Sequence, residues 1–419
     1  MQSEKEALLQ QLQAARRVAF GLAQAKTERK NAALFCLANL LDAASSDIVA
    51  ANRQDIEAAE AKGYAANLID RLKLDGSGVT ALAESIRAIA QLPDPVGVIM
   101  DQWQQPSGLD ISRVRKPLGV IGVIYESRPN VTIDAGVLCF KSGNAVILRG
   151  GKEAIHTNRL LCDLFQQALK QEDFDQALVQ LVQSPDRALV GEMLKAQEFI
   201  DVIVPRGGKS LVSRVMNEAR VPVFAHLEGI VHIYIHGSAE PDLVHSVVQN
   251  AKMRRTSVCG AAECLLIDES FDTEHIQKLF AALIDLGCTL RGDSACQALD
   301  DRVQAAKPED WGCEYLDCIL AVKMVANQAE AEAHIARYSS GHTEVILSAD
   351  TEAAEGFLHR VDSAIVMHNA SSQFADGGEF GMGAEIGIST GRMHARGPIG
   401  LTQLTTFHYQ VRGHGAIRP

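Results

Sequence analysis

The sequence predicts an α/β protein in which two domains each alternate strands with helices. Short apolar runs alternate with amphipathic stretches twice, from Leu118 to about residue 225 and from about residue 229 to 370. Strand–helix–strand units at this spacing are typical of doubly wound parallel sheets. The chain of 419 residues is also longer than one hydrophobic core ordinarily accommodates. We therefore expect a doubly wound domain, a second α/β domain and a β-hairpin arm.

Composition and charge narrow the class of protein. The chain is 47% hydrophobic but has no apolar run long enough for a membrane span, and its charged N-terminal stretch lacks the apolar block of a signal peptide. Nine cysteines without a CxxC pair favour a reducing compartment, the cytoplasm, and no Cys/His set shows metal-ligand spacing. The net charge of −12 argues against a nucleic-acid partner.

The first elements are expected to be helices followed by a hairpin. From about Ser3 to Leu92, apolar residues recur at helical spacing and charges lie between them. Residues 93–116 break this pattern, because ISRVRK alternates with period two and PSG indicates a turn. The closing stretch LTQLTTFHYQV also alternates and could pair with the hairpin. Such an arm can join another subunit or remain a surface hairpin.

The first α/β region carries polar residues where its strands end. The predicted strands are LGVIGVIY, AVILRGG, LVQLVQ, DVIVPRGG and VPVFA, with helices between them. In doubly wound sheets, ligands bind at the carboxyl ends of the strands. The polar ends here are residues 125–130, 149–152 and 205–209.

Two of these ends suit a phosphate group. In LRGGKE, Gly150 and Gly151 allow close backbone approach, while Arg149 and Lys152 supply charge at a helix N-terminus. PRGGKS repeats the pattern with Arg206, Gly207, Gly208 and Lys209. There is no GxGxxG fingerprint, and a single GG pair is usually only a turn. Two such pairs in one sheet favour an anion site.

The second α/β region contains a candidate nucleophile in NAKMRRTSVCGAAECLLID. Lys252, Arg254 and Arg255 precede Cys259, and small residues follow it. Nearby positive charge favours the thiolate, which is the attacking species. The alternative is a buried structural cysteine, which the local sequence alone slightly favours. A long glycine-rich tract after residue 370 predicts a loop that forms part of a site.

Several motifs together resemble one family. They are KPLGVIGVIYESRPNV from Lys116, KSGNAVILRGGKEAIHTN from Lys141, VPRGGK from Val204, the Cys259 segment, AHIARYSSGHTEVI from Ala333, and FADGGEFGMGAEIGIST with HARGPIGL between Phe374 and Leu401. This set resembles the aldehyde dehydrogenase superfamily, and within it the γ-glutamyl phosphate reductase branch. The likeness covers nearly the whole chain. It departs from the family at Gly260, Thr256 and Cys264, where asparagine, proline and threonine are usual.

The resemblance implies an aldehyde-dehydrogenase-like fold and a reaction. The substrate would be L-glutamyl 5-phosphate and the cofactor NADPH/NADP, in the second step of proline biosynthesis. We also expect a homo-oligomer, and the sequence leaves open whether the protein forms a complex with a glutamate 5-kinase. Residues 1–99 and 116–229 would bind NADPH, residues 230–395 would carry Cys259, and residues 100–115 and 396–419 would join subunits. The alternatives are a hydrolytic aldehyde dehydrogenase and a non-catalytic nucleotide-binding scaffold.

The resemblance also assigns residues. Cys259 would form a thioester that accepts hydride, and Asn130 or Arg128 would join the Cys259 N–H in stabilising the oxyanion. Arg149 and Lys152 would face the cofactor phosphates, and Glu314 would hold the nicotinamide ribose. The residues expected at the substrate are Arg255, His342, Thr343, Glu344 and Arg396. Arg396 could instead pair with Asp376 or Glu385, His342–Glu344 could simply pack a loop, and Glu228 could act as a base.

Overall fold

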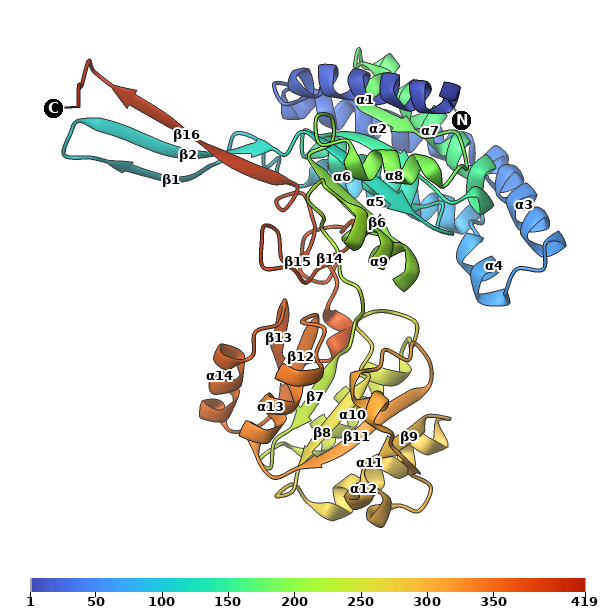
Figure 1. The fold of residues 1–419 in the computed structure, drawn as a ribbon, viewed down its shortest axis with the longest axis vertical. Coiled ribbons are helices and arrows are strands. Elements are labelled where there is room, and N and C mark those ends of the chain that lie inside the picture. The colour runs from blue at the N-terminus through green and yellow to red at the C-terminus, as the bar shows by residue number, and fades with distance from the viewer. Residues whose placement is uncertain (1, 419) are drawn as a thin grey trace. The chain divides into compact units, whose positions relative to one another are not determined.

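The computed structural model describes residues 2–418, which form two compact units. The first unit comprises the chain up to Ala225, Gly381–Gly387 and the chain from Ile399 onward. The second unit comprises His226–Phe380 and Ile388–Pro398. Each unit contains its own parallel sheet, which confirms the predicted α/β class (Figure 1). The roles assigned to the domains stay predictions.

The first unit is built on a four-stranded parallel sheet with the order β5-β4-β3-β6. Its strands are β3 (Val120–Tyr125), β4 (Ala145–Arg149), β5 (Val179–Leu181) and β6 (Val202–Arg206). The first three are buried along their whole length, because helices cover both faces of the sheet (Figure 1). The connecting segments are α6 (Val131–Lys141), η1 (Lys152–Ala154), α7 (Ile155–Gln171), η2 (Gln176–Leu178), α8 (Ala188–Lys195) and α9 (Lys209–Glu218).

The N-terminal helices form a layer over this sheet, as their periodicity predicts. They are α1 (Gln2–Leu22), α2 (Thr27–Ala43), α3 (Ser45–Ala61), α4 (Ala66–Leu72) and α5 (Gly76–Gln91). Helix α1 lies against the sheet, whereas α2 and α3 pack on α7. Two buried lysines tie the layer to α6: Lys30 Nζ donates to the Lys141 carbonyl at 3.0 Å, and Lys141 Nζ donates to the Ala90 carbonyl at 2.9 Å.

The arm is a three-stranded antiparallel sheet with the order β1-β2-β16. Its strands are β1 (Ile99–Gln104), β2 (Leu109–Pro117) and β16 (Thr405–Gly413), and β16 pairs with β2 from Thr405↔Pro117 to Gly413↔Leu109. The predicted pairing of the closing strand with the hairpin is confirmed (Figure 1). Large apolar side chains are exposed along the arm at Ile99, Phe407, Tyr409 and Val411.

The second unit is built on a seven-stranded parallel sheet with the order β10-β9-β11-β8-β7-β12-β13. Its strands are β7 (His232–Ile235), β8 (Cys264–Asp268), β9 (Thr289–Gly292), β10 (Gln304–Ala305), β11 (Ile319–Val325), β12 (Thr343–Leu347) and β13 (Ile365–His368). Its helices are α10 (Pro241–Met253), α11 (Thr273–Asp285), α12 (Ser294–Leu299), η3 (Pro308–Gly312), α13 (Gln328–Tyr338), α14 (Thr351–Arg360) and η4 (Ser372–Phe374). The strands β14 (Ile388–Ser389) and β15 (Gly397–Pro398) form a separate pair.

The structure corrects one predicted strand and contains two elements that were not predicted. The stretch VPVFA is not a strand but makes a single parallel bridge between Ile203 and Val223, because Pro222 has no N–H for a sheet ladder. Strand β9 and helix α12 were not predicted, since the short CTLRG stretch mixes apolar and polar residues without clear period. The glycine-rich tract has little regular structure, as expected.

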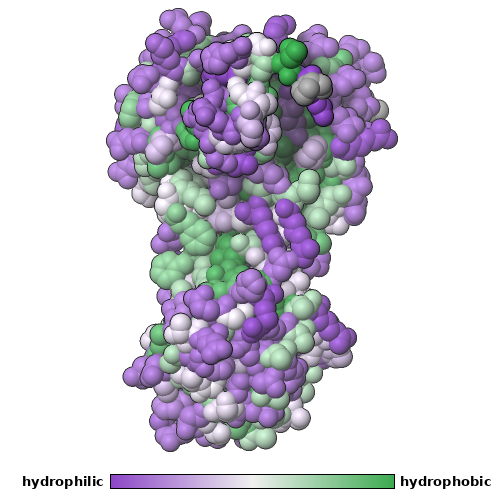
Figure 2. Space-filling view, turned by 90° about the vertical axis from the view of Figure 1, so that its left-hand side faces the viewer, coloured by the Kyte–Doolittle hydropathy of each residue, from purple (hydrophilic) through white to green (hydrophobic). Residues whose placement is uncertain are grey.

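Hydrophilic residues cover most of the face of each unit that Figure 2 shows. Within residues 2–418, no single helix is long and apolar enough to cross a membrane, and only α2 and α3 taken together, bent by 70°, meet that test.

Candidate active site

In the second unit, three loops bring a thiol and two imidazoles together. His226, Cys259 and His342 precede β7, β8 and β12, which are adjacent parallel strands, so all three residues lie at the amino edge of the sheet. One ring nitrogen of each histidine and Sγ of Cys259 lie within 4.8 Å of one another. Cys259 and His226 are half-buried, and His342 is fully buried. His226 was not predicted as a site residue, because a lone histidine in AHLEG carries no signal of its own.

Glycines let the backbone approach Cys259 closely. A Cβ atom at Gly229 would lie 2.5 Å from the Cys259 carbonyl oxygen and 2.9 Å from its Cβ. The Gly229 N–H donates to Glu314 Oε1 at 2.8 Å, so Glu314 fixes the loop segment that packs on the nucleophile. A Cβ at Gly260 would lie 2.9 Å from the Ser372 carbonyl oxygen. Gly260 therefore lets the Cys259 segment pack closely on the backbone at Ser372.

The two histidines are held by their Nδ1 atoms. His226 Nδ1 lies 2.8 Å from the Ile388 carbonyl oxygen, and because a carbonyl only accepts, Nδ1 carries the proton. His342 Nδ1 lies 2.9 Å from Thr343 Oγ1, and His342 Nε2 has no hydrogen-bond partner among the described residues. Burial, reinforced by His226, lowers the pKa of His342 to about 3. His342 is therefore neutral at physiological pH.

Of the three cations that precede Cys259, one belongs to a buried ion pair and two lie on the surface. Lys252 Nζ lies 2.6 Å from Glu263 Oε2, and both side chains are buried. Leu316 N–H donates to Glu263 Oε1 at 3.1 Å. Lys252 is therefore a structural cation. Arg254 and Arg255 are exposed, so the substrate role of Arg255 stays a prediction.

The side chains of the GHTE motif lie in two different places, one beside Cys259 and one beside His232. Glu344 faces His232, whose N–H and Nδ1 both lie 3.0 Å from Glu344 Oε2, and Ser363 Oγ donates to Glu344 Oε1 at 3.3 Å. Thr343 is buried beside His342. Of the three predicted residues, His342 alone belongs to the Cys259 cluster, and Glu344 has the position of a structural carboxylate.

Arg396 is engaged with a carboxylate. Its Nη1 donates to Asp362 Oδ1 at 2.6 Å and its Nη2 donates to the Asp362 carbonyl at 2.9 Å. Arg392 also pairs with Asp362. The partner of Arg396 is thus Asp362 rather than Asp376 or Glu385, and its substrate role stays a prediction.

In the first unit, the polar ends of β3, β4 and β6 lie at one sheet edge, as predicted. Gly150 packs so closely that a Cβ would lie 2.2 Å from Asn158 Nδ2 and 3.0 Å from the Tyr125 hydroxyl. Arg149 is buried and its Nη2 donates to the Pro185 carbonyl at 2.9 Å, whereas Lys152 is exposed. Lys152 therefore offers a charge to a ligand at this edge without burial.

A carboxylate occupies the second glycine turn. The Gly208 N–H donates to Glu126 Oε2 at 3.0 Å, and a Cβ at Gly207 would lie 2.5 Å from the same oxygen. Arg206 is half-buried, and both glycines are exposed. An anion at this turn would have to displace Glu126. A Cβ at Gly151 would likewise lie 2.0 Å from Glu153 Oε1, so a carboxylate lies at the first turn as well, and the phosphate role of both turns stays a prediction.

The two candidate oxyanion residues differ in their surroundings. Asn130 Nδ2 donates to Asp134 Oδ2 at 2.8 Å, and burial raises the pKa of Asp134 to about 6 despite this bond. Arg128 is exposed. Both belong to the first unit, so their predicted role beside Cys259 stays a prediction.

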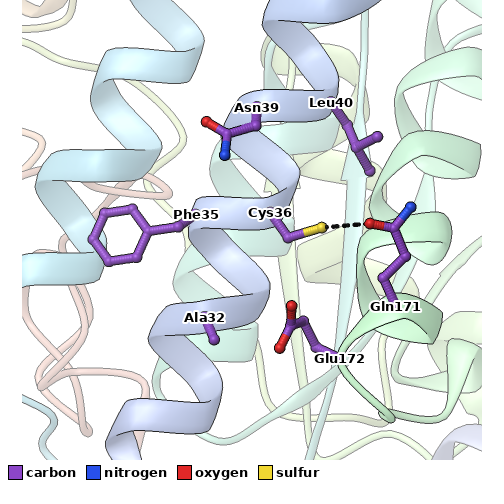
Figure 3. Close-up of a pocket in the computed structure, with 7 residues that line it drawn as sticks. All are labelled: Ala32, Phe35, Cys36, Asn39, Leu40, Gln171 and Glu172. Carbon is purple, nitrogen blue, oxygen red and sulfur yellow. Dashed lines mark hydrogen bonds between the residues drawn. The ribbon is translucent and has the colours of Figure 1, made fainter.

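A separate hollow on the first unit also contains a cysteine, but that thiol is not a candidate nucleophile. It lies between α2 and the end of α7, and its lining includes Cys36, Gln171 and Glu172 (Figure 3). Cys36 Sγ donates to Gln171 Oε1 at 3.0 Å. Burial and the nearby Glu172 carboxylate raise the pKa of Cys36. This thiol is therefore a poor nucleophile.

Comparisons with known proteins give the family. Residues 1–311 match the aldehyde dehydrogenase family. The γ-glutamyl phosphate reductase of Parvibaculum lavamentivorans is 56% identical over 407 residues, which cover 97% of this chain and 96% of that protein. The crystal structure of γ-glutamyl phosphate reductase from Thermotoga maritima superposes with a TM-score of 0.96 at 40% identity, covering 98% of this chain and 100% of that one.

A more distant structure supports the fold alone. The acetylating aldehyde dehydrogenase of Geobacillus thermoglucosidasius is 17% identical, with a TM-score of 0.70 over 100% of this chain and 98% of that one. The predicted aldehyde-dehydrogenase-like fold is thus confirmed. The chain belongs to the γ-glutamyl phosphate reductases, a branch of the aldehyde dehydrogenase family.

Proposed function

We propose that this chain reduces L-glutamyl 5-phosphate to glutamate 5-semialdehyde and phosphate, in the second step of proline biosynthesis. The observation that carries the proposal is the Cys259 thiol beside His226 and His342, within 4.8 Å. A nucleophile beside a base that a third group orients is a recurrent arrangement in covalent catalysis. Here the Ile388 carbonyl orients His226 through Nδ1, so Nε2 is the nitrogen that would take the thiol proton.

The chemistry then follows from these residues. His226 takes the proton of Cys259, and the thiolate attacks the acyl carbon of the substrate. A C–S bond forms and the bond from carbon to the phosphate oxygen breaks, so phosphate leaves and a thioester remains. The cofactor, when bound, supplies the hydride that reduces this thioester. Collapse of the reduced adduct releases the aldehyde and returns the thiolate of Cys259. His342 stays neutral throughout, because its pKa is about 3.

Members of this family use a nicotinamide cofactor, and we assign NADPH. The close packing of Gly150 on Asn158 and Tyr125 leaves no room for a Cβ, so this position requires glycine. Lys152 begins the short helix η1 and is exposed, which suits a charged ligand at a helix N-terminus. Glu314 accepts a hydrogen bond from the Gly229 N–H, and its contact with the nicotinamide ribose stays a prediction.

The proposal is tested by the reverse reaction. Purified protein is mixed with glutamate semialdehyde and NADP⁺, with and without inorganic phosphate, and cofactor reduction is followed by absorbance. We expect reduction only when phosphate is present, because phosphate is the acceptor of the acyl group. Reduction at the same rate without phosphate would make the chain a hydrolytic aldehyde dehydrogenase. No reduction in either case would favour a nucleotide-binding scaffold.

Lys152 provides a test of the cofactor. Lys152→Met is expected to raise the KM for NADPH by roughly tenfold and to leave the KM for NADH nearly unchanged, because a charge-assisted hydrogen bond contributes about 1.5–3 kcal/mol. Initial rates with both cofactors measure the ratio. Lys195→Met, which changes a cation of α8, is the matched control. Equal losses with both cofactors would refute contact with the 2′-phosphate.

We further propose a homo-oligomer and a cytoplasmic location. The exposed side chains of Phe407, Tyr409 and Val411 alternate along β16 and so share one face of the arm, and such an apolar face suits a subunit contact. The nine cysteines, all within residues 2–418, form no disulfide, which fits a reducing compartment. Transfer of the labile acyl phosphate from a glutamate 5-kinase would be favourable. A monomer in sedimentation equilibrium would contradict the role of the arm.

A further inference from the structure

We propose that His226, Cys259 and His342 also form a binding site for one Zn²⁺ ion, which blocks the nucleophile reversibly. Thiolate sulfur and imidazole nitrogen are the preferred ligands of Zn²⁺. Tetrahedral Zn²⁺ with these ligands places them roughly 3.3–3.6 Å apart. The present spacing, with all three ligand atoms within 4.8 Å, needs only small side-chain movements to reach this geometry.

In both histidines, the hydrogen bond of Nδ1 leaves Nε2 to bind a metal ion. Metal-ligating histidines usually engage the other ring nitrogen with a carbonyl or another polar group, which fixes the tautomer. His226 Nδ1 lies 2.8 Å from the Ile388 carbonyl oxygen, and His342 Nδ1 lies 2.9 Å from Thr343 Oγ1. In both residues Nε2 is then the nitrogen that would bind an ion. His342 Nε2 is also buried without a hydrogen-bond partner among the described residues, an observation independent of the cluster spacing.

A second cluster of the same composition gives an internal control. His232, Cys264 and His334 also place their ligand atoms within 4.8 Å, but all three are buried. Cys264 Sγ lies 3.8 Å from His334 Nε2, so this thiol already has a partner, and burial raises its pKa strongly. The cluster at Cys259 is the accessible one, since Cys259 and His226 are half-buried.

Binding is measured on the purified full chain with Co²⁺ as the spectroscopic probe, and Zn²⁺ is used to displace it. We expect one equivalent of Co²⁺ with a thiolate-to-cobalt absorption band. Cys259→Ser should abolish the band, and His226→Ala and His342→Gln should each weaken affinity at least tenfold. Cys264→Ala and Cys318→Ser should bind as the unchanged protein does. A band retained in Cys259→Ser, or lost in Cys264→Ala, would overturn the proposal.

The blocking of Cys259 by Zn²⁺ is measured through alkylation of the thiol and not through enzyme turnover. The rate at which iodoacetamide alkylates Cys259, followed by peptide mass spectrometry, should fall at least tenfold with Zn²⁺ and recover after chelation. The rate at Cys318 should not change. An alkylation rate at Cys259 that Zn²⁺ leaves unchanged would overturn the proposal. Metal binding and alkylation are independent of the proposed reaction, so loss of that assignment in the phosphate assay would leave the metal site standing.

Discussion

Cys259→Ala is expected to lower the phosphate-dependent rate by about 10⁴-fold or more, the scale seen when a covalent nucleophile is removed. Without Sγ no thioester can form at this position, and neither His226 nor His342 can form a reducible acyl intermediate of the same kind. Turnover number is measured in the direction that forms glutamyl phosphate, at saturating cofactor. Cofactor affinity, measured by fluorescence titration, should stay within about twofold.

A matched variant separates loss of chemistry from loss of fold. Cys318→Ser changes another half-buried cysteine of the second unit and should retain nearly full activity. Thermal unfolding of Cys259→Ala should differ little from that of the unchanged protein, since the side chain is small and half-buried. A Cys259→Ala protein with more than a tenth of the original rate would remove Cys259 as the nucleophile.

Local patterns in the sequence predicted most elements, because the signals for them are local. Apolar runs such as LGVIGVIY indicated buried strands, and period-two alternation indicated the arm, including the pairing of β16 with β2. The motifs also located the candidate nucleophile and the family. Two predictions failed for local reasons. CTLRG is too mixed in character to indicate β9, and Pro222 lies inside a stretch whose apolar residues resemble a strand.

The partners of the site residues could not be predicted, because they depend on strand order. His226, Cys259 and His342 meet only because β8, β7 and β12 are neighbours, and nothing in the order of the chain states that. The rule that ligands gather at carboxyl ends of strands also points away from this cluster, which lies at the amino edge. Likewise, Lys252 looked like a cation for the thiol, whereas Glu263 neutralises it in the core.

The buried Lys252–Glu263 pair gives the second prediction with a large effect, which is on stability. Lys252→Met is expected to lower the free energy of unfolding by about 3–5 kcal/mol, because it leaves the Glu263 carboxylate buried without its counter-charge. Glu263→Gln should cost a similar amount by stranding Lys252. The double variant should lose far less than the sum, since both charges are gone and the introduced glutamine amide can still accept from Leu316 N–H. Denaturant unfolding of the four proteins gives the coupling free energy. Additive losses would show that the two charges act independently.

The pH dependence distinguishes an uncompensated charge from lost packing. Burial raises the pKa of Glu263, and Lys252 opposes that rise. Removing Lys252 raises the pKa further, so the folded variant binds a proton that the unfolded chain has released above about pH 4. Stability of Lys252→Met should therefore be greatest at low pH and be lost as pH rises through the folded-state pKa. Its deficit should be larger at pH 8 than at pH 5.5. A deficit that is the same at both would assign the loss to the missing lysine stem, and the carboxylate of Glu263 would then be tolerated alone.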